Sequence, residues 1–88
     1  MKNKPPSHFV YIVQCADTSL YTGYARDVQK RLLEHNGDAK IAGAKYTHGR
    51  RPVVLQYYEE FSTRSDALKR EYEIKQLSRK EKEHLISP

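Results

Sequence analysis

Two tyrosines, Tyr11 and Tyr21, are the first residues in this chain whose types and positions indicate chemistry. They lie on the two arms of a predicted hairpin, so pairing of the arms would bring both phenols to one place. A phenol can both donate and accept a hydrogen bond, and it can exchange a proton. Tyrosine is also common in strands as an ordinary core aromatic, and composition alone favours that alternative.

Arg31 and His35 are four residues apart on a predicted helix, so they point in the same direction. Arg31 lies next to the buried stripe that we expect from Val28 and Leu32, with Leu33 beside them. The planar guanidinium fork of an arginine in this position can bind a phosphate. The alternative is a solvated or salt-bridged surface arginine.

Glu71 falls inside the apolar stripe of a second predicted helix. A carboxylate on the core-facing side of a helix is costly unless it is paired with a cation or binds a metal ion. Glu71 is therefore a candidate metal ligand, with a salt bridge to a nearby Arg or Lys as the alternative. The stripe itself consists of Ala67, Leu68, Ile74 and Leu77.

The elements that must position these residues follow from periodicity and turn signals. We predict a hairpin over residues 9–24, a helix over 27–37, a strand over 53–61, and helices over 62–77 and 78–86. Asp27 is the expected N-cap of the first helix, and the pairs Thr63 with Asp66 and Ser78 with Glu81 have capping-box spacing. The order β-β-α-β-α-α predicts an α+β fold, with a three-stranded antiparallel sheet flanked by helices. The first strand is apolar on both faces and should be covered on both sides.

Composition indicates one small domain of 88 residues, with 38% hydrophobic and 31% charged residues. We expect a flexible leader over residues 1–7 and a single domain over 8–88. No stretch is long enough to cross a membrane, no signal peptide is evident, and the one cysteine fits a reducing cytoplasm. The net charge of +5 suits a polyanionic partner such as nucleic acid, although a basic adaptor that binds an acidic protein has the same composition.

Residues 38–52 contain Gly, Pro and several cations, and they predict a loop. Cations, hydroxyls and backbone amides on one loop are suited to binding a phosphate backbone, whereas the alternative is a merely solvated loop. The candidate nucleic-acid contacts in this loop are Lys45, Tyr46, Thr47, His48, Arg50 and Arg51.

Several short motifs follow one another along the chain: VYI at 10–12, YTG at 21–23, Arg31, HNG at 35–37, GAKYT at 43–47 and Glu71. Each motif is weak alone, but the ordered set is specific. It resembles the GIY-YIG nuclease superfamily, and in particular its small stand-alone bacterial members, and the resemblance extends over about residues 9 to 86.

The resemblance implies an endonuclease that hydrolyses DNA phosphodiester bonds, with branched or damaged DNA as candidate substrates. In such a site Tyr11 would be the general base, and Tyr21 would orient water or phosphate. Arg31 would bind the non-bridging oxygens, and His35 would contact phosphate or shuttle a proton. Glu71 would hold a single divalent ion, Mg²⁺ or Mn²⁺.

The same resemblance implies that Gly23 lets the backbone approach the substrate closely, and that a partner protein can supply substrate specificity. The sequence departs from the family pattern at two places. Val10 replaces the leading glycine of the first motif, and residues 78–86 lack the asparagine that many members carry after the second helix. The alternative function is therefore a nucleic-acid-binding module of the same fold with weak or no catalysis.

Overall fold

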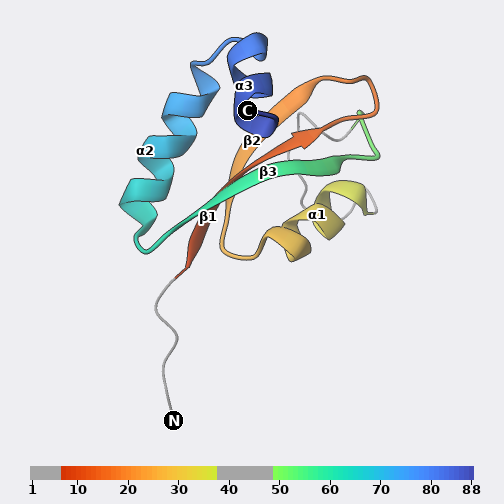
Figure 1. Cartoon of the computed structure of the whole chain (residues 1–88). Helices are drawn as coiled ribbons and strands as arrows, with labels where there is room; N and C mark the ends of the chain where they lie inside the picture. The colour runs from red at the N-terminus through yellow and green to blue at the C-terminus, as the bar shows by residue number, and fades with distance from the viewer. Residues whose placement is uncertain (1–6, 38–48) are drawn as a thin grey trace.

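The computed structural model describes residues 7–37 and 49–88 of the chain. The elements follow in the order β1 (His8–Gln14), β2 (Leu20–Ala25), α1 (Val28–Asn36), β3 (Val54–Phe61), α2 (Arg64–Lys75) and α3 (Arg79–Ile86). The strands form one antiparallel sheet in the order β2-β1-β3, with β1 at its centre (Figure 1). The predicted α+β fold and its element order are confirmed.

β1 is buried on both faces, as its two apolar faces predicted. On one face, Tyr11 and Val13 pack in a cluster that includes Val28 of α1. On the other face, Val10 and Ile12 belong to a second cluster, with members from α2 and α3. α1 therefore covers one side of the sheet, while α2 and α3 cover the other (Figure 1).

The helix ends confirm the capping signals in the sequence. The side chain of Asp27 accepts a hydrogen bond from the backbone amide of Lys30 at 3.0 Å and caps α1. The side chain of Thr63 caps α2 by accepting a hydrogen bond from the backbone amide of Asp66. Among the described residues, the Asp66 side chain does not bond back to the Thr63 amide, so only half of the capping box is formed. At α3 both halves of the capping box are present, between Ser78 and Glu81.

Two leucines depart from the predicted burial. Leu33 is 73% exposed and Leu68 is 38% exposed, although the sequence placed Leu33 beside the buried stripe of α1 and Leu68 within that of α2. Each helix covers the sheet with a narrow stripe, and a residue one position on is turned by about 100° toward solvent. Ala67 and Ile74 are fully buried in α2, so Leu68 falls at the edge of its buried face.

The predicted leader lies outside the described residues except for Ser7. The Ser7 hydroxyl donates a hydrogen bond to Glu60 at 2.7 Å and ties the start of β1 to β3. In the part of the chain that the structure describes, no helix has the length and apolar character needed to cross a membrane.

Candidate active site

Tyr11 and His35 form a hydrogen-bonded pair between β1 and α1. The Tyr11 hydroxyl lies 2.8 Å from Nε2 of His35, and both side chains are only 1% exposed. His35 is in the last turn of α1, and its ring meets the Tyr11 ring edge-on, with the centroids 5.9 Å apart. Two groups that can exchange a proton are therefore held together in the core of this face.

Tyr21 completes an aromatic trio with this pair, as the hairpin pattern predicted. Its ring centroid lies 6.5 Å from that of Tyr11 and 5.6 Å from that of His35. The register explains the approach, because Tyr21 pairs with Val13 and so sits diagonally across from Tyr11. The two phenols come to one place, together with an imidazole.

Gly23 makes room for the Tyr11 phenol. Gly23 is paired with Tyr11 across the β1–β2 ladder, and the Tyr11 ring lies against it. A Cβ atom at position 23 would be 2.5 Å from the Tyr11 hydroxyl oxygen and 2.6 Å from the carbon that carries it. The glycine is thus needed for the placement of Tyr11, and this contact could not be inferred from the motif itself.

Arg31 lies at the exposed rim of the same face. Its guanidinium forms a 2.8 Å ion pair with Glu34, and the side chains of both residues are about one quarter exposed, at 28% and 27%. A hollow of about 230 Å³ opens beside this pair at the start of α1. Its lining combines three cations with two carboxylates: Ala25, Arg26, Asp27, Lys30, Arg31 and Glu34.

The electrostatics of the pair keep both groups uncharged at rest. Burial raises the pKa of Tyr11 to about 12, against a hydrogen bond from Arg31 that lowers it. Burial, followed by the positive charge of Arg31, lowers the pKa of His35 below its ordinary value of 6.5. His35 is therefore a neutral imidazole at pH 7, and with its proton on Nδ1 it accepts the Tyr11 hydrogen bond at Nε2.

Glu71 belongs to α2, on the other side of the sheet, but it acts on the same phenol. Its negative charge contributes to the raised pKa of Tyr11, which places the carboxylate within electrostatic range of the hydroxyl. The Glu71 side chain is 18% exposed and forms a 3.0 Å ion pair with Lys75. The sequence-based alternative of a salt bridge is thus present alongside the candidate ligand role.

The donor set around Glu71 bears on the implied divalent ion. Across residues 7–37 and 49–88, no group of three or more His, Cys, Asp or Glu side chains could hold a metal ion. Mg²⁺ commonly keeps several waters and binds through one or two carboxylates together with substrate phosphates. A single carboxylate such as Glu71 fits that mode of binding, in which the phosphate supplies part of the coordination shell.

The predicted DNA-binding loop is only partly described. Lys45, Tyr46, Thr47 and His48 lie outside the described residues. Arg50 forms a 3.0 Å ion pair with Asp17 in the hairpin turn, and its carbonyl accepts a bond from the Ala16 amide. Arg51 is partly buried. The described end of the loop is therefore attached to the β1–β2 turn.

Asn36 has a role that the sequence did not reveal. Its amide nitrogen donates to the Val53 carbonyl at 3.0 Å, and its amide oxygen accepts from the Val53 amide at 2.7 Å. These two bonds fix the end of α1, and so His35, to the segment that enters β3. The sequence signal was the HNG motif at 35–37, which we used only as part of the family resemblance.

The chain also matches a known protein-family model. The family model described as the GIY-YIG catalytic domain matches residues 7–84. The chain belongs to the GIY-YIG family. The match covers every element from β1 to α2 and most of α3, and its range includes Tyr11, Tyr21, Arg31, His35 and Glu71.

Similar proteins are small and carry the designation UPF0213. The chain is 60% identical over 80 residues to UPF0213 protein SSP2268 of Staphylococcus saprophyticus, covering 91% of this chain and 94% of that protein. It is equally similar to UPF0213 protein SA0446 of Staphylococcus aureus, with the same coverage.

Two solution NMR structures are similar in fold and sequence. UPF0213 protein BH0048 from Bacillus halodurans has a TM-score of 0.58 and 47% identity, covering 92% of this chain and 83% of that one. Protein EF2693 from E. faecalis has a TM-score of 0.59 and 42% identity, covering 96% and 85%.

Proposed function

We propose that this protein is a metal-dependent endonuclease that hydrolyses DNA phosphodiester bonds. The observation that carries the proposal is the buried 2.8 Å bond between Tyr11 and His35, within electrostatic range of Glu71. Family membership supports a nuclease, and the net charge of +5 supports a polyanionic substrate.

In the proposed mechanism Tyr11 and His35 together remove one proton from the attacking water by two linked proton transfers. A phenol with a pKa of about 12 is almost never ionised at pH 7, so Tyr11 alone is a weak base. His35 is neutral and lies 2.8 Å from the hydroxyl, so its Nε2 takes the phenol proton while the phenol oxygen takes a proton from the attacking water. The raised pKa of Tyr11 is then compatible with catalysis, because no free phenolate has to accumulate.

Arg31 and Tyr21 act on the phosphate. The guanidinium of Arg31 lies at the rim of the site, where its fork can bind non-bridging oxygens in place of Glu34. Its positive charge also favours the ionised form of Tyr11. Tyr21, in contact with both members of the pair, orients the water or the phosphate.

Glu71 would hold a single divalent ion, Mg²⁺ or Mn²⁺, together with the scissile phosphate. When bound, such an ion neutralises charge on the phosphate and stabilises the leaving oxygen. Binding would require Glu71 to exchange its ion pair with Lys75 for the metal, which frees a cation beside the cut.

We further propose that the segment from Lys45 to Arg51 binds the DNA backbone away from the cut, and that Gly23 lets the β2 backbone approach the substrate. A partner protein would supply specificity for branched or damaged DNA. The single, buried, free cysteine, Cys15, is compatible with a cytoplasmic location.

A second candidate function is a nucleic-acid-binding module with weak or no catalysis. Two observations favour it: the pKa of Tyr11 is raised rather than lowered, and residues 78–86 contain no asparagine. The two candidates differ in whether cleavage depends on Glu71, because a binder does not require a metal ligand.

The deciding experiment is cleavage of labelled single-stranded, duplex, nicked, flapped and branched DNA with Mg²⁺, by wild type and Glu71→Gln. Glu83→Gln is the matched control, because Glu83 also forms a 3.0 Å ion pair with a cation four residues away on its helix. We expect cleavage by wild type and the control, and none by Glu71→Gln, with DNA binding retained by all three. Binding without cleavage by any of them would establish the binding module, and equal cleavage by all three would exclude Glu71 as a ligand.

A further inference from the structure

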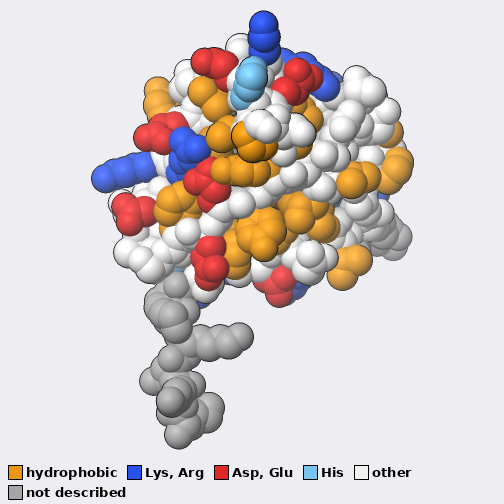
Figure 2. All heavy atoms as spheres, viewed as in Figure 1, with side chains coloured by type: hydrophobic (Ala, Val, Ile, Leu, Met, Phe, Trp, Pro, Cys, Tyr) orange, Lys and Arg blue, Asp and Glu red, His pale blue; other side chains and the backbone are white. Residues whose placement is uncertain are grey.

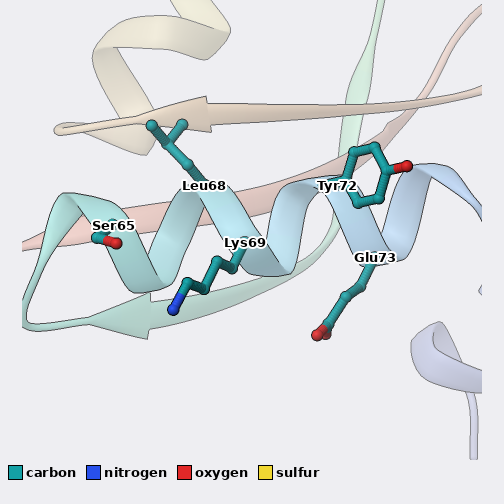
Figure 3. Close-up of a pocket in the computed structure, with 5 residues that line it drawn as sticks. All are labelled: Ser65, Leu68, Lys69, Tyr72 and Glu73. Atoms are coloured by element: carbon teal, nitrogen blue, oxygen red, sulfur yellow. The ribbon is translucent and has the colours of Figure 1, made fainter.

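One edge of α2 carries two hydrophobic side chains that are exposed to solvent. Tyr72 is 67% exposed and Leu68 is 38% exposed, and they lie one helical turn apart. Figure 3 shows both side chains on the same edge of α2, with Lys69 and Glu73 extending from the helix in another direction. A tyrosine and a leucine side by side on a solvent-facing edge indicate a binding surface more than a packing element.

This surface is hollowed and flanked by charges. A shallow cavity of about 640 Å³ is lined by Ser65, Leu68, Lys69, Tyr72 and Glu73. On the α2 side of the molecule, hydrophobic side chains lie among those of Lys, Arg, Asp and Glu (Figure 2). Glu73 is engaged by Arg70 at 3.2 Å, so part of the negative charge here is already balanced.

The surface is adjacent to the candidate active site. Tyr72 directly follows Glu71, so it lies about 100° further around the helix and one residue along it. Arg64 is one turn before Leu68 on the same edge, and its guanidinium lies 5.8 Å from the centre of the Tyr24 ring on β2. A row of one cation, one aliphatic side chain and one aromatic ring thus extends along α2, beside the carboxylate proposed to hold the metal.

We propose that Tyr72 stacks with an unpaired nucleobase of the DNA strand that is cut. Leu68 supplies the neighbouring apolar contact, and Arg64 and Lys69 attract the phosphates on either side. Exposed aromatic rings flanked by cations are the means by which proteins bind single strands, since every base has a π-face. A base in an intact duplex is already stacked on both faces, so the surface selects single-stranded, flapped or gapped DNA. This inference rests on the proposed function and names its substrate class.

The first test is equilibrium binding of a labelled oligothymidylate and of a fully paired duplex, in EDTA so that no cleavage occurs. We expect Tyr72→Ala to weaken binding to the single strand by about five- to 150-fold, the range for loss of one stacked base, and to change duplex binding less than twofold. Tyr72→Phe, which keeps the ring, should bind as wild type does. Tyr58→Ala is the control, because Tyr58 is a similarly exposed tyrosine, at 57%, on β3. Equal loss for the single strand and the duplex would overturn the proposal.

The second test uses a spectroscopic signal of stacking. The chain contains no tryptophan, so Tyr72→Trp introduces a single indole whose emission should be quenched by oligothymidylate and not by the duplex. Tyr58→Trp, the control, should respond to neither. An unquenched Tyr72→Trp protein that still binds the single strand would overturn the proposal.

The outcomes also distinguish a failure of the stacking site from a failure of the proposed nuclease activity, and they test whether something other than DNA binds the α2 surface. If Tyr72→Ala loses single-strand binding while wild type cuts nothing, the stacking site stands and the nuclease does not. If wild type cuts DNA but Tyr72→Ala binds the single strand normally, the stacking site is wrong. Sedimentation of the same proteins tests a second copy as the occupant, since Lys69 and Glu73 could pair across a two-fold axis. Dimers that dissociate on Tyr72→Ala, with unchanged DNA binding, would contradict the proposal.

Discussion

Tyr11 and Ile12 are consecutive residues of β1 with the same burial, 1% and 0% exposed, yet they face opposite sides of the sheet. Ile12 packs with Val10, Ala67 and Ile74 in a cluster of aliphatic side chains. Tyr11 points its hydroxyl at His35 beneath α1. Consecutive residues of one strand thus supply an aliphatic side chain to the core of one face and one member of a hydrogen-bonded, titratable pair to the other.

The two faces also differ in where they place charge. On the α2 face, Arg70 bonds the carboxylate of Glu59 through two nitrogens, at 3.0 Å each, and connects α2 to β3 at the partly exposed rim. On the α1 face, the titratable pair lies in the interior, and the ion pair of Arg31 with Glu34 is at the rim. Arg70 and Glu59 thus join two elements, whereas Arg31 acts within the site by lowering the pKa of Tyr11 against the effect of burial.

The largest expected effect comes from removing the Tyr11 hydroxyl. Tyr11→Phe should reduce cleavage by about 100- to 10,000-fold, the usual contribution of a general base. It should lower the free energy of unfolding by only about 1–3 kcal/mol, because Nε2 of buried His35 loses its partner. Cleavage rates and urea denaturation measure the two effects. Cleavage within threefold of wild type would show that the phenol is not the base.

The neighbouring residue should give the opposite result. Ile12→Ala should lower the free energy of unfolding by about 2–5 kcal/mol through a cavity in the aliphatic cluster, and leave the rate per folded molecule within about twofold. Ile12→Val, with an expected cost of about 0.5–1.5 kcal/mol, provides a measurement if the alanine variant is too unstable. If either Ile12 variant lost activity under conditions in which it is fully folded, the activity would not depend on the Tyr11 face alone, and the comparison would be wrong.

A methyl group at position 23 tests the packing of Tyr11 itself. Gly23→Ala should cost about 1–3 kcal/mol, because the new Cβ would lie 2.5 Å from the Tyr11 hydroxyl, and the displaced phenol should reduce cleavage. Gly49→Ala is the control for stability only, because Gly49 belongs to the segment proposed to bind DNA; apart from its chain neighbours, no atom of the described residues lies within 4 Å of a Cβ there. Urea denaturation of both variants and a cleavage assay of Gly23→Ala measure the effects. Stability equal to that of Gly49→Ala, or cleavage equal to that of wild type, would refute the interpretation.

The smallest effect is the pH dependence of stability. The pKa of His35 is below 6.5 in the folded protein, so the unfolded chain binds a proton more readily. The neutral His35 therefore contributes its full share to the free energy of unfolding above pH 6.5. This contribution is lost as the pH falls from 6.5 toward the lower pKa that His35 has in the folded protein. His8 shifts in the same direction, through burial and the charges of Arg26 and Arg64.

We expect the free energy of unfolding to decline between pH 7.5 and 5.5, and His35→Gln to make that decline shallower. His8→Gln should remove the part of the decline that is due to His8, and the double variant should remove most of the decline. Urea denaturation across this range measures each slope. An unchanged slope in His35→Gln would show that the imidazole is not held neutral.

Local patterns in the sequence were sufficient for the elements, their caps and the convergence of Tyr11 with Tyr21. Hairpin pairing and helix periodicity act between residues that are close in sequence, so they can be predicted from it. The contact of Gly23 with the Tyr11 hydroxyl and the clamp of Asn36 on Val53 depend on side-chain placement across elements. Tyr72 was missed for a similar reason, because its exposure depends on how α2 is rotated against the sheet.

The order β2-β1-β3 also has a consequence for how the chain acquires its structure. The central strand is the first one to be synthesised, and its second neighbour is distant, since His8 pairs with Phe61. A β1–β2 hairpin alone is marginally stable, so neither hydrophobic layer can close before β3 has emerged from the ribosome. Such non-local pairing slows folding and leaves β1 exposed during translation. Losing a few residues from the start of β1 should therefore be far more damaging than losing as many from the end of α3.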